Sequence, residues 1–144
     1  MARRLLLVLA AVSLLSCGKE VGRVPFAAEG TDSTTTTLVA GDVAFWTDID
    51  LAYDGTASLH YEIELSQGGA PVATALCDPL GHMTVKESWV ETNLGASHTR
   101  RGRGKMNCSA TLAAGGATTV KATLAYAHRP VAVTLRKADL VVRQ

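Results

Sequence analysis

An alternation of apolar and polar side chains in the middle of the chain restricts its fold more than any other feature. A period of two places all the apolar side chains on one face of a β-strand, with the polar ones on the other. Residues 43–51 and 59–65 both have this period, and Asp54-Gly55 between them is typical of a turn. In the first segment Thr47 shares the apolar face and Ala44 and Trp46 share the other face with Asp48 and Asp50. The apolar positions of the two core faces are Val43, Phe45, Ile49, Leu51, Leu59, Tyr61, Ile63 and Leu65.

The rest of the chain repeats this pattern in short segments separated by Gly, Asp or Pro. Strands are expected near residues 34–39, 71–77, 83–93, 106–112, 120–126 and 131–142. A change of phase between Trp89 and Val90 predicts a bulge or an edge strand, and residues 93–105 are expected to form a turn region. We therefore predict an all-β fold: an antiparallel β-sandwich of seven to eight strands, loosely immunoglobulin-like, with a closed barrel as the alternative.

The N-terminus indicates where the protein is located. Arg3 and Arg4 precede an apolar run at residues 5–15, which is too short to span a bilayer and is typical of a secretory signal. The sequence Leu14-Leu15-Ser16-Cys17 then resembles the lipobox of bacterial lipoproteins. The resemblance implies removal of residues 1–16, diacylation of Cys17 and a stable anchor in the lipid bilayer of the cell envelope, with the outer membrane favoured. The alternative is an ordinary cleaved signal peptide.

Domain boundaries follow from this interpretation. We expect residues 17–33 to be a lipidated terminus and flexible tether, and residues 34–144 to form the β-sandwich. In an exported chain, Cys77 and Cys108 are predicted to form a disulfide. A metal site at Cys77, His82, His98 and Cys108 is disfavoured because the spacings are irregular. No cofactor is predicted.

Charge is divided between the two halves of the domain. Residues 29–64 contain eight acidic side chains and no lysine or arginine, whereas residues 98–144 contain nine basic side chains and one acid. We expect these charges to pair between facing strands of one molecule. The alternative is a dipolar surface that meets an anionic partner. The candidate contact residues for such a partner lie on a segment expected to be a glycine-rich loop: Arg100, Arg101, Arg103 and Lys105.

Two other candidate sites are weighed against simpler explanations. Asp48, Asp50 and Asp54 are as close together as the acids of a calcium loop, but their spacing does not fit one, so a solvated acidic face is favoured. Trp46 and Trp89, if exposed, could stack on sugars.

The nucleophile-elbow, Walker phosphate-loop, dinucleotide-binding and helical zinc-protease motifs are absent, and the four histidines are scattered, so no enzyme is predicted. We expect a non-catalytic binding or structural module of the cell envelope that contacts an envelope protein and not nucleic acid. The alternative is a cell-surface glycan-binding or adhesion module, and a hydrolase is the least favoured hypothesis.

Overall fold

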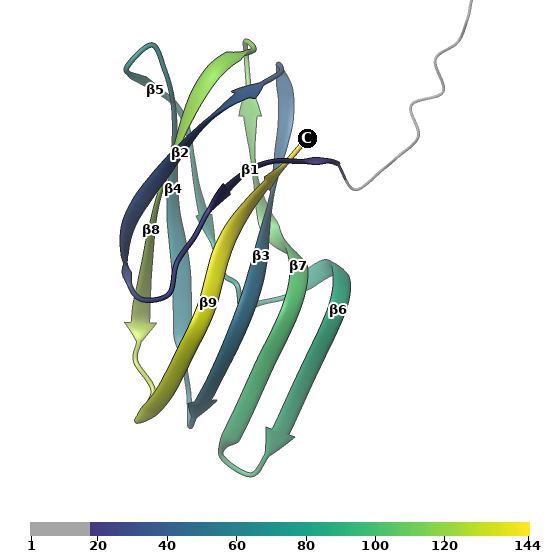
Figure 1. Ribbon diagram of the computed structural model, residues 1–144, viewed down its shortest axis with the longest axis vertical. Helices are drawn as coiled ribbons and strands as arrows, with labels where there is room; N and C mark the ends of the chain where they lie inside the picture. The colour runs from purple at the N-terminus through teal and green to yellow at the C-terminus, as the bar shows by residue number, and fades with distance from the viewer. Residues whose placement is uncertain (1–17) are drawn as a thin grey trace, which may run out of the picture.

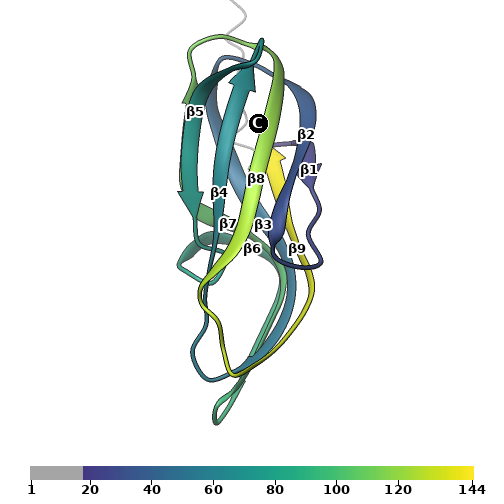
Figure 2. The same ribbon diagram turned by 90° about the vertical axis from the view of Figure 1, so that its left-hand side faces the viewer.

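The computed structural model describes residues 18–144, which form nine strands in two antiparallel sheets and contain no helix (Figure 1). The sheets pack face to face, so the predicted β-sandwich is confirmed. The five-stranded sheet has the order β1 (Glu20–Val24), β9 (Ala132–Arg143), β3 (Gly41–Asp54), β7 (Ser97–Leu112) and β6 (Met83–Leu94). The four-stranded sheet has the order β2 (Gly30–Leu38), β8 (Gly116–His128), β4 (Ser58–Gln67) and β5 (Ala70–Cys77), and it faces the viewer in Figure 2.

The alternating residues of β3 and β4 form the centre of the core between the sheets. Leu59, Tyr61 and Leu65 of β4 are at most 1% exposed, and burial of each such side chain contributes about 1.5 to 3 kcal/mol. The Tyr61 hydroxyl donates to the carbonyl oxygen of Ala138 at 2.9 Å and lies 2.8 Å from the Thr47 hydroxyl. Burial raises the pKa of the Tyr61 phenol, so the phenol stays neutral and links the two sheets by hydrogen bonds.

The predicted disulfide is confirmed and joins the two sheets. Cys77 ends β5 in the four-stranded sheet, and Cys108 lies within β7 in the five-stranded sheet, with their Cα atoms 5.5 Å apart. Because β5 and β7 belong to different sheets, the bridge closes the sandwich on the side away from β1 and β2.

The predicted flexible tether is wrong for residues 20–24 and 30–33, which form β1 and the start of β2, and Phe26 in the connection between them is buried. Strand pairing begins immediately: the Lys19 amide donates to the Gln144 carbonyl oxygen at 2.8 Å, and the Gln144 amide donates back at 3.1 Å. This segment lacks a clean period of two because β1 and β2 are mostly half-buried or exposed. The signal at residues 1–16 and the lipid site at Cys17 lie outside the described residues.

The predicted turn region at residues 93–105 is also wrong, because most of it belongs to the long strand β7. The bulge is confirmed: the β6–β7 register shifts between Glu87 and Val90, and β6 is the edge of its sheet. Gly102 lies opposite this bulge. A Cβ on Gly102 would lie 2.5 Å from the carbonyl oxygen of Ser88, so this glycine allows close approach of two strands rather than a turn.

Candidate functional site

The four basic residues predicted to contact an anionic partner lie on strand β7, where successive side chains point to opposite faces. Arg101, Arg103 and Lys105 lie on the outer face of the five-stranded sheet. Arg100 lies on the inner face, where its side chain is only 13% exposed and its Nε is 2.6 Å from a carboxylate oxygen of Glu91. The structure therefore brings three of the four together and removes Arg100 from the set.

Of the two acids on the outer face of β3, Asp50 lies between basic residues of both neighbouring strands, whereas Asp48 faces a basic residue on β7 and the acid Asp139 on β9. Asp48 is opposite Arg103 of β7, and Asp50 is opposite Arg101 on one side and Lys137 of β9 on the other. The Asp48 carboxylate lies 3.0 Å from the Lys137 ammonium. The acidic and basic halves of the sequence thus pair within one molecule, as expected from the charge distribution.

Arg23 of β1 connects this face to the edge of the sheet. One of its nitrogens donates to both Asp48 and Asp139 at 2.9 Å, and its Nε donates to Glu20 at 2.7 Å. Partial burial opposes ionisation of Asp48, but the hydrogen bonds from Arg23 and Lys137 outweigh it and lower the pKa of this carboxyl group. Desolvation of Arg23 is likewise outweighed by its acidic partners, so its pKa is raised.

These contacts separate the three acids considered for calcium. Asp48 is bound by Arg23 and Lys137, whereas Asp54, at the end of β3, accepts a hydrogen bond from the Ser97 hydroxyl at 2.7 Å. Within residues 18–144, no group of three or more His, Cys, Asp or Glu side chains could hold a metal ion. The three carboxylates act as ion-pair and hydrogen-bond acceptors.

A groove of about 290 Å³ runs across this outer face, and we call it the β3–β7 groove. Ser88, at one wall, has a φ of 51° because it sits in the β6 bulge, which turns it out of the strand ladder. Arg101 forms no ion pair among the described residues, and Arg103 has only a 3.6 Å contact with Glu87. The residues that line the groove are Asp48, Ile49, Asp50, Ser88, Arg101, Gly102, Arg103 and Lys137.

The groove depends on residues that the sequence did not single out. Lys137 reaches it from a strand 87 positions beyond Asp50 in the chain, and Ser88 reaches it from β6. Only the strand order and register place them together. The one signal available in the sequence was the phase change between Trp89 and Val90, which predicted the bulge next to Ser88.

Of the two tryptophans that could stack on sugars, one is buried and the other is only partly exposed. Trp46 is fully buried beneath Arg143, and Trp89 is half-buried against the core, with the Lys86 ammonium 5.5 Å from its ring. The exposure that sugar stacking requires is therefore absent at Trp46 and only partial at Trp89.

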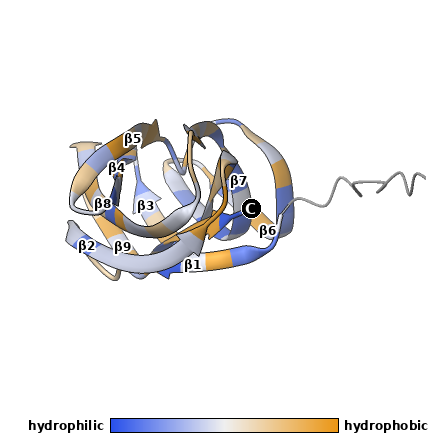
Figure 3. Ribbon diagram, turned by 90° about the horizontal axis from the view of Figure 1, so that it is seen from above, coloured by the Kyte–Doolittle hydropathy of each residue, from blue (hydrophilic) through white to orange (hydrophobic). Residues whose placement is uncertain are grey.

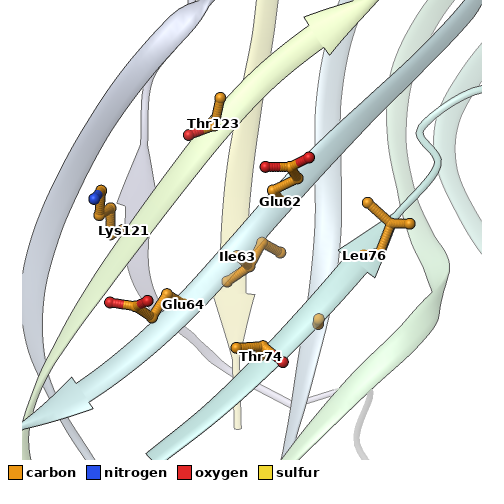
Figure 4. A pocket seen from close by; sticks show the side chains of 8 residues that line it. Glu62, Ile63, Glu64, Thr74, Leu76, Lys121 and Thr123 are labelled. Atoms are coloured by element: carbon orange, nitrogen blue, oxygen red, sulfur yellow. The ribbon is translucent and has the colours of Figure 1, made fainter. Parts of the chain in front are cut away.

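A larger hollow, of about 480 Å³, lies on the outer face of the four-stranded sheet (Figure 4). Glu62 and Glu64 of β4 point outward here beside Lys121 of β8, with Leu76 of β5 at the far side. Leu76 is 68% exposed. The hollow is lined by two acidic side chains and one basic side chain, so its net charge is negative. The β3–β7 groove is lined by three basic and two acidic side chains, so its net charge is positive.

No known protein family, curated protein or solved structure matches the chain. Within residues 18–144, no helix is long and apolar enough to cross a membrane. The fold and the groove define an all-β sandwich with a mixed-charge outer face that carries incompletely paired arginines.

Proposed function

We propose that this chain is an exported, lipid-anchored protein of the cell envelope that binds an acidic segment of a partner protein in the β3–β7 groove. The N-terminal signal and the lipobox-like residues before Cys17 support the anchor. The observation that carries the binding role is the state of Arg101, which lines the groove, is exposed and has no acidic partner among residues 18–144.

The groove favours a carboxylate-bearing segment over a neutral one. Arg101 and Arg103 present planar guanidinium groups, which bind carboxylates with two parallel hydrogen bonds. Asp48 and Asp50, which also line the groove, would repel a misplaced acid and so restrict how the segment lies. Both arginine side chains are exposed to solvent, so their attraction to an acidic segment is screened by water and by salt. Binding is therefore expected to be fast, modest in affinity and weakened by salt.

A non-catalytic role is supported by the environment of the reactive side chains. Among the described residues, His98 bonds only to Asn93 and His60 only approaches Glu62, so neither has a hydroxyl or thiol to activate. Cys77 and Cys108 are joined to each other. The two cysteines are therefore unavailable as nucleophiles, and within residues 18–144 neither of these histidines has a nucleophile within hydrogen-bond distance to activate.

The test compares two variants with the same change of charge on opposite faces. Arg101→Glu alters the β3–β7 groove, and Lys121→Glu alters the outer face of the four-stranded sheet; both side chains are exposed and without an ion pair in the described chain. Crosslinking in intact membranes followed by affinity purification should lose a specific partner at least five-fold with Arg101→Glu and retain it with Lys121→Glu. Equal recovery from both variants would contradict the groove as the binding site.

The anchor is tested separately. Cys17→Ala should move the protein from the membrane fraction to the soluble fraction, whereas Arg101→Glu should leave it in the membrane. Unchanged membrane association of the Cys17→Ala variant would refute lipidation without bearing on the groove.

A further inference from the structure

The folded domain begins almost immediately after the predicted lipid site. Only Gly18 and Lys19 separate Cys17 from β1, and Lys19 is already paired with Gln144 through two backbone hydrogen bonds. Each residue of extended chain spans at most about 3.5 Å, so a lipid-bearing residue 17 would be joined to the first strand residue by no more than about 10 Å of chain. A flexible tether of sixteen residues would instead reach about 20 to 25 Å.

We propose that one end of the sandwich, which we call the turn end, rests directly on the lipid headgroups and holds the strands upright on the membrane. This inference depends on the proposed lipid anchor at Cys17. It adds the orientation of the domain and identifies which residues contact lipid.

The turn end is the end at which β1 starts and β9 finishes. The Gln144 side chain binds the backbone of Val39, donating to its carbonyl oxygen at 2.9 Å and accepting from its amide at 2.8 Å. Gln67 donates to the carbonyl oxygen of Ala114 at 3.0 Å, and Gly115 packs against the backbone of Val39. Three turns are thus held together beside the point where the chain enters the domain, and Figure 3 views the molecule from above this end.

The exposed residues of these three turns carry no ionisable group. Val39, the largest of them, is 64% exposed. Contact through these three turns alone would therefore remove no charge from water, which is the main cost of bringing a protein surface to a bilayer, while exposed Lys19 and Asp42 lie immediately beside them. The residues are Val39, Ala40, Gly68, Gly69, Ala70, Ala113, Ala114 and Gly115.

The opposite end of the sandwich differs in charge. Glu29 and Arg129 lie in its connections, 3.3 Å apart, and Asp54 ends β3 there. Val131, in the connection between β8 and β9, is fully exposed. The twelve residues of β9 separate Val131 from the turn end by about 35 to 40 Å.

If the turn end rests on the membrane, the distance of the β3–β7 groove from the lipid headgroups is also fixed. Asp48 and Asp50 lie six to eight residues along β3 from Asp42, which corresponds to about 20 to 27 Å. The range of electrostatic attraction at physiological salt is about 8 Å. The groove therefore faces sideways, too far from the headgroup phosphates to be attracted to them, and remains accessible to a protein partner.

The experiment places a photo-crosslinking phenylalanine analogue at one of two exposed valines in the full-length, membrane-bound protein. Replacement of Val39 probes the turn end, and replacement of Val131 is the matched control at the far end. After irradiation, mass spectrometry should find lipid adducts at least ten-fold more often at position 39. The same spectra report the mass of the N-terminal peptide and thus the acylation of Cys17.

The outcomes distinguish contact of the turn end with lipid from lipidation of Cys17. Acylated Cys17 with equal lipid labelling at both positions, or with protein adducts in place of lipid at position 39, would overturn the seating and leave the anchor intact. Absence of acylation would overturn both. A second variant inserts ten Gly and Ser residues after Gly18, and labelling at position 39 should then fall to the level of position 131. Persistent labelling would show that the short link does not hold the turn end at the membrane.

Discussion

The guanidinium carbon of Arg143 lies 3.8 Å from the ring centroid of Trp46, on the outer face of the five-stranded sheet. Trp46 points away from the sandwich core, yet it is fully buried because Arg143 covers it. Two nitrogens of Arg143 donate to the two carboxylate oxygens of Glu87 at 3.2 and 3.3 Å. This contact joins three strands, β9, β3 and β6, and shields an indole that would otherwise meet solvent.

Arg143→Ala should lower the free energy of unfolding by about 1 to 3 kcal/mol. The substitution removes a desolvated cation–π contact and the aliphatic stem that covers the indole. Urea unfolding measures the loss, and the tryptophan emission maximum should shift to longer wavelength as Trp46 becomes hydrated.

Arg129→Ala is the matched control, because Arg129 lies 5.2 Å from the Tyr126 ring but its side chain is 63% exposed. Its loss should cost less than about 0.5 kcal/mol. If both alanine variants had the same free energy of unfolding, packing of Arg143 on Trp46 would not contribute significantly to stability.

The disulfide should stabilise the domain and resist reduction in the native state. In the loop-entropy model a closure of this length contributes about 3 to 4 kcal/mol, and Cys77 is only 1% exposed. The double variant Cys77→Ala with Cys108→Ala should lose roughly that amount in urea unfolding. Mass spectrometry after thiol alkylation should find the bridge intact with reductant alone and open when denaturant is added. Rapid reduction of the native protein would contradict burial of the bridge.

Gly102→Ala should be much more damaging than Gly116→Ala. Both glycines have positive φ, 135° and 147°, so an alanine strains the backbone at either position by about 1 to 3 kcal/mol. Only Gly102 has a neighbour in the way, the carbonyl oxygen of Ser88, whereas a Cβ on Gly116 meets nothing within 4 Å. Chemical denaturation should show a difference of at least about 1 kcal/mol between the variants. Equal losses would mean that the bulge relaxes without cost.

The sequence predicted the parts of this fold whose burial alternates. β4 is the clearest example: Leu59, Tyr61, Ile63 and Leu65 face the core, and their period of two fixes both the strand and its face. The pairing of Cys77 with Cys108 was predicted from two facts alone: the chain is expected to be exported to an oxidising compartment, and these are the two cysteines left once Cys17 is assigned to the lipid. These features are local or limited to a pair of residues, so no knowledge of strand order was needed.

The two wrong predictions, the tether and the turn region, both concern strands that bury few side chains or contain glycine. β1 and most of β2 lie at sheet edges, where side chains stay half-exposed and the period of two is lost. In β7, Gly102 and Gly104 suggested a turn, but their missing side chains make room for Ser88, Trp89 and Met83 of β6. The partner of each glycine lies on another strand, which composition alone does not reveal.

The candidate site was only partly predictable for the same reason. Arg101 and Arg103 were identified from their density of charge, but whether they are free depends on which acids stand opposite them. Asp48 is already taken by Arg23 and Lys137, from strands at opposite ends of the chain. Trp46 shows the reverse case, since its polar-face position suggested exposure until Arg143 was found to cover it.

Acid should destabilise the domain through the carboxylates that these cations bind. The pKa of Asp48 is lowered because hydrogen bonds from Arg23 and Lys137 outweigh the effect of burial. The pKa of Glu87 is lowered chiefly by hydrogen bonds from Arg143. A lowered pKa in the folded state means that the contribution to stability is present above the ordinary carboxyl range, about pH 4, and is lost as pH falls through the folded-state values.

Asp48→Asn should therefore be less stable than the wild type at pH 7, where Arg23 and Lys137 lose their shared partner, and should flatten the fall in stability below about pH 4. Denaturant midpoints measured from pH 7 to pH 2 test the slope. Lys137→Met, which removes one of the two cations, should move the NMR titration of the Asp48 carboxyl carbon to higher pH. Parallel acid profiles for the wild type and Asp48→Asn would mean that this carboxylate does not contribute to the acid sensitivity of the fold.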